Sequence, residues 1–283
     1  MSSSTARAVL ATRSLRWSSP LLFNDPFDVP RELIFGINPQ QLVEASSRHV
    51  AQLIQHPPDD TRELSLKLRL IVDTVKKGIP QELLTQMLAG LAEGASRQVP
   101  TSASMDELRS MWSTAVADMR ILCFTESPAH AAMWYHYADR YTGVVLEFRC
   151  NDHTDSPWLI ARPVNYPVDK PAVYTAEGWA ELLALDIDVA VRRLLDIATY
   201  TKSHDWAYEK EWRLVTFKRP YDSGHFTHYP FHAEDLATIY LGPLISEQDR
   251  GELLKLLIAF PRAKALSVSL SLSRDFVFDE AAG

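Results

Sequence analysis

The segment DWAYEKEWRLVTF, residues 205–217, joins a helical pattern to a strand pattern. Residues 180–202 before it, AELLALDIDVAVRRLLDIATYTK, predict one long amphipathic helix, because apolar side chains recur three and four positions apart. RLVTF, residues 213–217, is typical of a strand. Helices and strands follow one another in the same irregular way elsewhere, without the alternation that a parallel sheet requires. The sequence therefore predicts an α+β fold.

Further strands and a helical region surround this segment. The strand-like stretches are RILCFTE (120–126), VVLEF (144–148), TIYLG (238–242) and ALSVSLSL (265–272). Between about residues 39 and 119 the pattern is helical, with breaks at Pro57-Pro58 and at Gly78-Ile79-Pro80. We expect a single mixed domain over residues 1–283, with a mostly antiparallel sheet and a helical insertion at about 39–119.

Two of the expected helices carry signals at their ends. Ser127-Pro128 is expected to open a helix over AHAAMWYHYADRY, residues 129–141, and Gly143 is expected to end it in a left-handed conformation. Ser246 and Asp249 have the spacing of a capping box at the start of SEQDRGELLKLLIAF, residues 246–260.

Composition limits the classes of function. The 283 residues include 29 basic and 36 acidic side chains, so the net charge is −7 and gives no overall attraction to nucleic acid or to anionic membranes. We see neither a secretory signal nor a run of about 20 apolar residues, and we expect a cytoplasmic protein. Cys123 and Cys150 lie in apolar, strand-like surroundings and are expected to be buried, reduced thiols. P-loop, GxGxxG, GxSxG and HExxH motifs are absent from the sequence.

Four blocks, taken in order, resemble a bacterial family catalogued as domain of unknown function 2971. The blocks are LRWSSPLLFNDPFD (15–28), LCFTESPAHAAMWYHYADRYTGVVLEF (122–148), TKSHDWAYEKEWRLV (201–215) and IYLGPLISEQDRGELLKLL (239–257). The resemblance spans most of the chain and implies a fold, but no agreed activity. Members of that family usually begin with an extra strand carrying a tyrosine or a His-Tyr pair. Here STARAVLATRS precedes the first block, so the start is expected to be shortened, genuinely or through a misassigned start codon.

Glu209 and Glu211 form the first candidate site. In an extended segment alternate side chains share a face, so Glu209, Glu211 and Arg213 are expected on one side. Two neighbouring carboxylates repel each other unless a cation lies between them, and Arg213 or Lys202 can supply that cation. A glutamate held in this way can bind a ribose hydroxyl or stabilise a developing cation in glycosyl transfer. The alternative is a salt-bridged strand edge with no catalytic role.

YEKEW, residues 208–212, also resembles the Glu-x-Glu element of mono-ADP-ribosyltransferases, which lies at the start of a strand. LRWSSP and CFTES are loose counterparts of the arginine strand and the Ser-Thr-Ser-like strand of those enzymes. The resemblance implies an enzyme that cleaves the nicotinamide bond of NAD without a metal, in defence against phage or in toxin biology. Glu211 would then be the catalytic carboxylate, with Glu209 and His136 beside it.

The aromatic segment MWYHYADRYTG, residues 133–143, is the second candidate. On a helix, His130, Trp134, Tyr137 and Tyr141 form one stripe, and His136 and Arg140 form a neighbouring one. Trp134 and Tyr137 could hold a nicotinamide or a base, and His136 is expected to be exposed to a cleft because charged residues flank it. Packing of the stripe into the core is the alternative.

Two polar segments complete the candidates. In FNDPFD, residues 23–28, Asn24 and Asp25 either bind a ligand or shape a turn through their own backbone. In GHFTHYPFH, residues 224–232, three histidines suggest zinc, but Gly224, Thr227 and Pro230 favour a loop or an edge strand, and no nearby residues complete a ligand set. We therefore expect no metal site.

Three functions follow from these candidates. The first is NAD-dependent ADP-ribosyl transfer, with Trp134, Tyr137, Asn24, Asp25, Arg213 and Lys202 holding the NAD. The second is a non-catalytic module that binds or senses a small molecule or nucleotide. The third is a metal-dependent hydrolase built on the histidine-rich segment. The sequence leaves the substrate, the pathway and the oligomeric state open.

Overall fold

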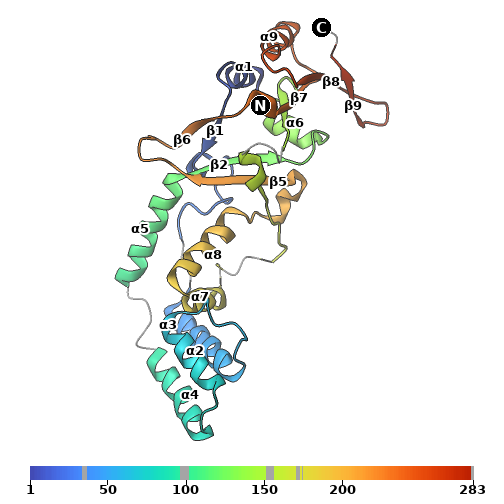
Figure 1. Cartoon of the computed structure of the whole chain (residues 1–283). Helices are drawn as coiled ribbons and strands as arrows, with labels where there is room; N and C mark the ends of the chain where they lie inside the picture. Colours follow the sequence, from blue (N-terminus) through green and yellow to red (C-terminus); the bar gives the residue numbers. More distant parts are fainter. Residues whose placement is uncertain (34–36, 96–101, 151–155, 170–172, 174, 282–283) are drawn as a thin grey trace. The chain divides into compact units, whose positions relative to one another are not determined.

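The computed structural model describes residues 1–33, 37–95, 102–150, 156–169, 173 and 175–281. Its helices and strands confirm the α+β fold (Figure 1). The chain forms two compact units, and each contains segments that are distant in the sequence. The first unit comprises residues 1–23, 118–164 and 207–283, and the second comprises residues 24–117 and 165–206.

The first unit contains a five-stranded sheet. Its strands are, in spatial order, β4 (Arg162–Pro163), β5 (Glu211–Phe217), β2 (Met119–Thr125), β1 (Ser14–Ser18) and β6 (Phe226–Pro230). All neighbouring strands run antiparallel, as expected. Thr125 lies opposite Glu211 and Cys123 lies opposite Arg213, so these four side chains share one face of the sheet.

A four-stranded sheet belongs to the same unit. Its strands are, in spatial order, β3 (Val144–Phe148), β7 (Leu236–Leu241), β8 (Lys264–Leu270) and β9 (Phe276–Glu280). The β7–β8 pair is parallel and is connected through helix α9 (Glu247–Leu257), while the other pairs are antiparallel. The predicted strands at 144–148, 238–242 and 265–272 all fall in this sheet.

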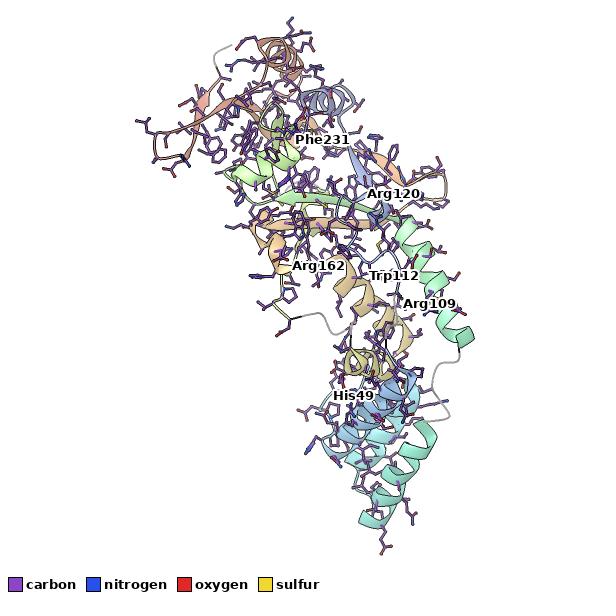
Figure 2. The ribbon with its side chains drawn as sticks, turned by 180° about the vertical axis from the view of Figure 1, so that it is seen from behind. His49, Arg109, Trp112, Arg120, Arg162 and Phe231 are labelled. Carbon is purple, nitrogen blue, oxygen red and sulfur yellow. The ribbon has the colours of Figure 1, made fainter. Side chains whose placement is uncertain are left out.

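One apolar core joins the two sheets of the first unit. Leu15 and Trp17 of β1 and Leu214 of β5 meet Ile239 and Leu241 of β7 in this core. Phe231, labelled in Figure 2, follows β6 directly and packs edge-on against Phe148. Because side chains alternate along a strand, the polar residues between these apolar ones point to the opposite face of the five-stranded sheet.

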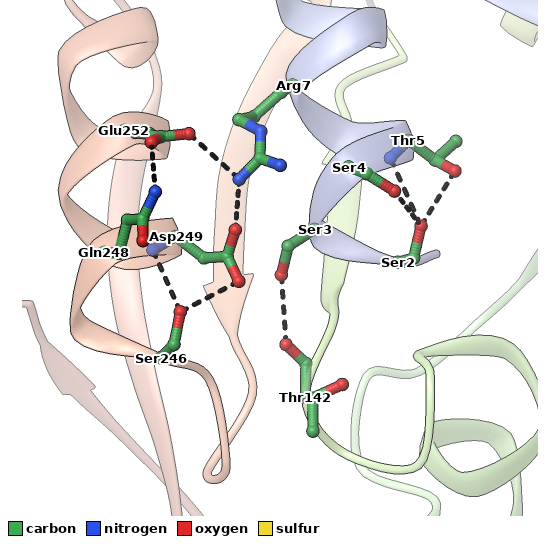
Figure 3. A network of polar contacts seen from close by, with 10 residues as sticks. All are labelled: Ser2, Ser3, Ser4, Thr5, Arg7, Thr142, Ser246, Gln248, Asp249 and Glu252. Carbon is green, nitrogen blue, oxygen red and sulfur yellow. Dashed lines mark hydrogen bonds and ion pairs between the residues drawn. The ribbon is translucent and has the colours of Figure 1, made fainter.

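Helix α1 (Ser3–Thr12) packs beside α9 through a polar network. Arg7 forms ion pairs with Asp249 and Glu252, and the hydroxyl of Ser246 donates a hydrogen bond to Asp249 (Figure 3). Ser246 also accepts a hydrogen bond from the backbone N–H of Asp249, which confirms it as the predicted N-terminal cap. The Ser246 hydroxyl and then Arg7 lower the pKa of Asp249.

The aromatic helix is shorter than predicted. Helix α6 spans Ala131–Tyr137, with His130 as its N-terminal flanking residue, so Ser127-Pro128 does not open it. The left-handed residues after it are Asp139, Arg140 and Tyr141, whereas Gly143 has no positive φ. Tyr141 and Arg140 therefore lie beyond the helix, and the stripes expected to include them do not form.

Gly143 and Gly242 are required by close contact between two chain segments. The N–H of Gly242 donates to the carbonyl of Gly143 at 3.0 Å. A Cβ on Gly242 would lie 2.3 Å from the carbonyl oxygen of Tyr141 and 2.6 Å from that of Gly143. Both neighbours are backbone atoms, so no flexible side chain can move aside.

We therefore expect Gly242→Ala to lower the free energy of unfolding by about 2 kcal/mol, because the backbone must shift to admit the methyl group. Chemical denaturation measures this change. Gly251→Ala is the matched control, because its Cβ would meet nothing within 4 Å and Gly251 lies inside α9. That control is expected to gain up to about 1 kcal/mol. Equal losses in both variants would contradict the close-contact argument.

The second unit is helical. Its helices are α2 (Pro39–Gln55), α3 (Leu66–Lys76), α4 (Gln81–Ala95), α7 (Ala176–Ala184), α8 (Ile187–Thr199) and, except for its last residue, α5 (Ser102–Asp118). The helical region expected at 39–119 thus belongs to the same unit as residues 165–206. Trp112 of α5 donates a hydrogen bond to the carbonyl of Pro30 at 2.8 Å (Figure 2).

The single long helix predicted over 180–202 is wrong, because α7 ends at Ala184 and α8 begins at Ile187. Leu185 is extended and pairs with Leu64 in an isolated bridge. Asp186 then caps α8 by accepting a hydrogen bond from the N–H of Asp188 at 3.1 Å. Asp186 lies within the predicted helical pattern, and the spacing of apolar residues alone gives no sign that this aspartate begins a new helix.

Across the described ranges, no helix has both the length and the apolar character needed to cross a membrane.

Candidate functional site

The candidate site lies on the face of the five-stranded sheet that points away from the apolar core. Strand β5 places Glu211 and Arg213 on this face, and β2 places Thr125 and Cys123 directly opposite them. Ser18 of β1 lies opposite Ile121, so Arg16, two residues earlier, belongs to the same face. Three adjacent strands thus contribute polar side chains to one surface.

Glu211 and Arg213 form a buried, bidentate ion pair. Arg213 Nε donates to Glu211 Oε1 at 2.7 Å, and Arg213 Nη2 donates to Oε2 at 3.1 Å. The Arg213 side chain has no exposed surface and that of Glu211 is 6% exposed. The ring of Phe23 lies 5.6 Å from the guanidinium. The pair satisfies both charges in a place where either charge alone would be costly.

Glu209 is buried as well, but it does not lie in the strand. It is the last residue of the 3-10 helix η4 (His204–Glu209), and Lys210 after it is left-handed with φ 45°. The expectation that Glu209 shares a strand face with Glu211 is therefore wrong, because the chain turns at Lys210. Thr125 Oγ1 donates to the carbonyl of Glu209 at 2.7 Å and fixes this turn against β2.

Tyr137 of α6 connects the aromatic helix to the two glutamates. Its hydroxyl donates to Glu209 Oε1 at 2.7 Å. Partial burial, followed by the hydrogen bond to Glu209 and the charges of Glu209, Glu211 and Cys123, raises the pKa of Tyr137 well above its ordinary value. The hydroxyl is therefore a neutral donor at physiological pH. Tyr137, Glu209, Glu211 and Arg213 form one cluster with Cys123 at its edge.

We expect Tyr137→Phe to lower the free energy of unfolding by about 2 kcal/mol at neutral pH, because the buried Glu209 carboxylate loses a donor. Since the pKa of Tyr137 is higher in the folded than in the unfolded protein, its contribution is complete below about pH 10 and declines as the pH rises above that. The difference in unfolding free energy between wild type and Tyr137→Phe, measured from pH 7 to 11, is expected to shrink above pH 10. A difference that stays constant would contradict this.

The other aromatic candidates differ in their surroundings. Trp134 is buried, stacks on Phe276 and donates its indole N–H to the carbonyl of Pro128 at 2.6 Å, which favours the core-packing alternative. His136 is exposed, and its ring packs edge-on against Tyr137. His130 stacks on Tyr208 with ring centroids 5.3 Å apart.

Asn24, Asp25 and Lys202 belong to the second unit. Asp25 Oδ1 accepts a hydrogen bond from the N–H of Phe27 at 2.8 Å, which confirms the turn interpretation for this residue. Lys202 is buried with Asp28, 3.6 Å away, and its ammonium lies 4.9 Å from the ring centre of Trp206. Residues from the first and third blocks of the family resemblance thus pair within this unit.

The cysteines are not buried as expected. Cys123 and Cys150 are both exposed, and neither is in a disulfide. Half-buried Leu122 and Phe124 flank Cys123 along β2, whereas Cys123 itself lies on the polar face. Neither Thr125 nor Cys123 was predicted from the sequence as a member of the site. The pairing of β2 with β5, which brings them beside Glu211 and Arg213, involves segments about 90 positions apart.

The histidine-rich segment forms the edge strand that was expected. His228 lies in β6, at the edge of the five-stranded sheet, and His225, His228 and His232 are exposed. In the part of the chain that the structure describes, no group of three His, Cys, Asp or Glu residues could hold a metal ion.

Comparison with known proteins gives one family. Residues 133–214 match the family described as "Protein of unknown function (DUF2971)". This segment runs from α6 to β5 and includes Tyr137, Glu209, Glu211 and Arg213. No curated protein and no solved structure matches the chain.

Proposed function

Since residues 133–214 place the chain in the DUF2971 family, whose description states no activity, we propose that it is an ADP-ribosyltransferase-like enzyme that uses NAD. Glu211 is its catalytic carboxylate in this proposal, with Glu209 and Tyr137 beside it. In this proposal the ligand is a nucleotide. The protein acts in the cytoplasm, in defence or toxin biology.

The observation that supports the proposal is the arrangement of three strands. The Glu-x-Glu resemblance requires a glutamate at the start of a strand, and Glu211 is the first residue of β5. CFTES contributes Cys123–Thr125 to β2 and LRWSSP contributes Leu15–Ser18 to β1, and β2 lies between β5 and β1 in the sheet. Segments that resemble the enzyme motifs only loosely in sequence are therefore adjacent in one sheet, and Arg16, Thr125 and Glu211 of these strands lie on one face.

The chemistry follows from the charges on this face. In NAD cleavage the bond between the nicotinamide nitrogen and the ribose C1′ breaks, and its electron pair leaves with neutral nicotinamide. The ribose becomes cationic, and a buried carboxylate such as Glu211 stabilises that charge or binds the ribose hydroxyl. A hydroxyl, a guanidinium or water then bonds to C1′ and loses a proton. Arg16 on β1 is exposed and suits the NAD pyrophosphate, because guanidinium binds phosphate through paired hydrogen bonds.

The test is to incubate the purified protein with NAD and to measure nicotinamide release together with transfer of labelled ADP-ribose to protein. Nicotinamide release that depends on Glu211 supports the proposal. If the folded protein neither consumes NAD nor labels itself or a cell extract, the proposal is wrong.

A non-catalytic, ligand-binding role is the second candidate, because the bidentate contact with Arg213 already occupies both oxygens of Glu211. In that case NAD raises the melting temperature without being consumed. Arg16→Ala is then expected to remove the thermal shift. Trp134→Ala is a poor probe for this purpose, because Trp134 is part of the core.

A further inference from the structure

A separate pocket of about 500 Å³ lies on the four-stranded sheet of the first unit. Its floor contains Glu147 of β3, Thr238 of β7 and Lys264 of β8. Glu147 lies opposite Thr238 and Thr238 lies opposite Lys264, so the three form a row across the sheet on one face. The labels β7 and β8 in Figure 1 locate these strands. None of these residues belongs to the cluster around Glu211.

Positive charge predominates in this pocket. Arg149, Arg262 and Lys264 line it together with a single carboxylate, Glu147. Among the residues that the structure describes, Arg262 and Lys264 have no ion-pair partner, and the contact given for the Arg149 side chain is to the carbonyl of Glu234 at 3.4 Å. A chain with net charge −7 thus leaves three cations against one anion in one hollow. Such clustering attracts an anionic ligand.

Glu147 has a hydrogen-bond partner inside the pocket. The hydroxyl of Tyr240 donates to Glu147 Oε2 at 2.9 Å. Burial and this hydrogen bond raise the pKa of Tyr240 to about 12, so the hydroxyl stays protonated at physiological pH. Glu147 Oε1 makes no hydrogen bond to the described residues and can accept one from a ligand hydroxyl. The pocket therefore combines cationic donors with one acceptor, which suits an anion that also carries hydroxyl groups.

We propose that this pocket binds a sugar phosphate ester, free or as part of a nucleotide. The phosphate lies among Arg149, Arg262 and Lys264, and a sugar hydroxyl donates to Glu147. The volume is within the range of small-molecule sites, roughly 300 to 1,000 Å³. Guanidinium groups bind phosphate oxygens through paired, charge-assisted hydrogen bonds. This inference does not depend on catalysis at Glu211.

Titration calorimetry of the whole chain with ribose 5-phosphate and with ADP tests the proposal, with adenosine as the probe that lacks phosphate. Both phosphorylated probes are expected to bind and adenosine is not. Arg262→Ala and Lys264→Ala are each expected to weaken binding about tenfold, because a hydrogen bond to a charged group is lost. Lys255→Ala on α9 removes an exposed cation outside the pocket and is expected to leave binding unchanged.

Glu147→Gln is expected to change the affinity for phosphate in the opposite direction. It removes the one negative charge and keeps an oxygen for Tyr240 but not one for a sugar hydroxyl, so binding of inorganic phosphate, which has no sugar, is expected to tighten about threefold. Because ADP is also part of NAD, Arg16→Ala, which removes the group proposed to bind the NAD pyrophosphate, separates the two sites. ADP binding that is lost in Arg262→Ala/Lys264→Ala and kept in Arg16→Ala supports the pocket. Absence of binding by both phosphorylated probes, or binding that survives the double substitution, overturns the proposal.

Discussion

Glu211→Gln is expected to lower the rate of NAD cleavage by about 10³-fold, within the range that a positioned acid or base contributes. Glutamine has the same shape and keeps an oxygen for Arg213, but it cannot balance positive charge on the ribose. The loss is expected in the rate at saturating NAD more than in KM, because the carboxylate acts mainly on the transition state. Nicotinamide release over time, with the NAD concentration varied, measures both quantities.

Glu126→Gln is the matched control for this measurement. Glu126 accepts a hydrogen bond from the indole N–H of Trp212 at 2.8 Å, and Trp212 alternates with Glu211 along β5, so it points to the other face. This substitution also removes one carboxylate near β5 and is expected to leave the rate unchanged. Since Glu211→Gln removes the carboxylate that contacts buried Arg213, the folded fraction of each variant is measured by thermal denaturation. Full activity in folded Glu211→Gln would exclude Glu211 as the catalytic carboxylate.

Arg213→Met is expected to lower the free energy of unfolding by about 3 to 5 kcal/mol, the cost of leaving one partner of a buried ion pair without the other. Methionine has a length similar to that of arginine, so the loss arises mainly because the Glu211 carboxylate loses its bidentate contact with Arg213. Urea denaturation at neutral pH measures the change. Arg16→Met on the neighbouring strand is the control, because Arg16 is exposed and is expected to change stability by less than about 1 kcal/mol.

The double variant Glu211→Gln/Arg213→Met separates charge from packing. Without the carboxylate, the penalty of Arg213→Met is expected to fall by more than half, because the charge that Arg213 contacts in a bidentate manner is no longer present. Additive losses in the double variant would show that Arg213 stabilises β5 through packing, for example against Phe23, and that the ion pair is secondary.

The sequence predicted those elements whose apolar and polar residues alternate without interruption, and those that begin with a standard capping residue. Strands β3, β7 and β8 and the cap Ser246 of α9 were predicted from residues within a few positions of one another. The same holds for Glu211 and Arg213, whose shared face follows from the two-residue period of a strand. The turn at Asp25 also follows from a side chain bonding its own backbone.

Local pattern failed where a tertiary contact competed with it. Helix α6 ends at Tyr137, and three left-handed residues follow before Gly143 and Gly242 bring two backbone segments together. The break between α7 and α8 occurs where Leu185 pairs with Leu64, which is distant in the sequence. In both places the helical periodicity continues through residues that are not helical.

The amino-acid order alone was enough to establish the fold class and the membership of Glu211 and Arg213 in one polar face. The tertiary structure decided two contacts that the spacing of residues along the chain does not predict. Tyr137 donates a hydrogen bond to Glu209, 72 positions away, and strand pairing brings Cys123 and Thr125 beside Arg213 and Glu211. The physical reason is that side-chain alternation is a property of neighbouring residues. Strand register and buried hydrogen bonds, in contrast, depend on which distant segments exclude water from one another.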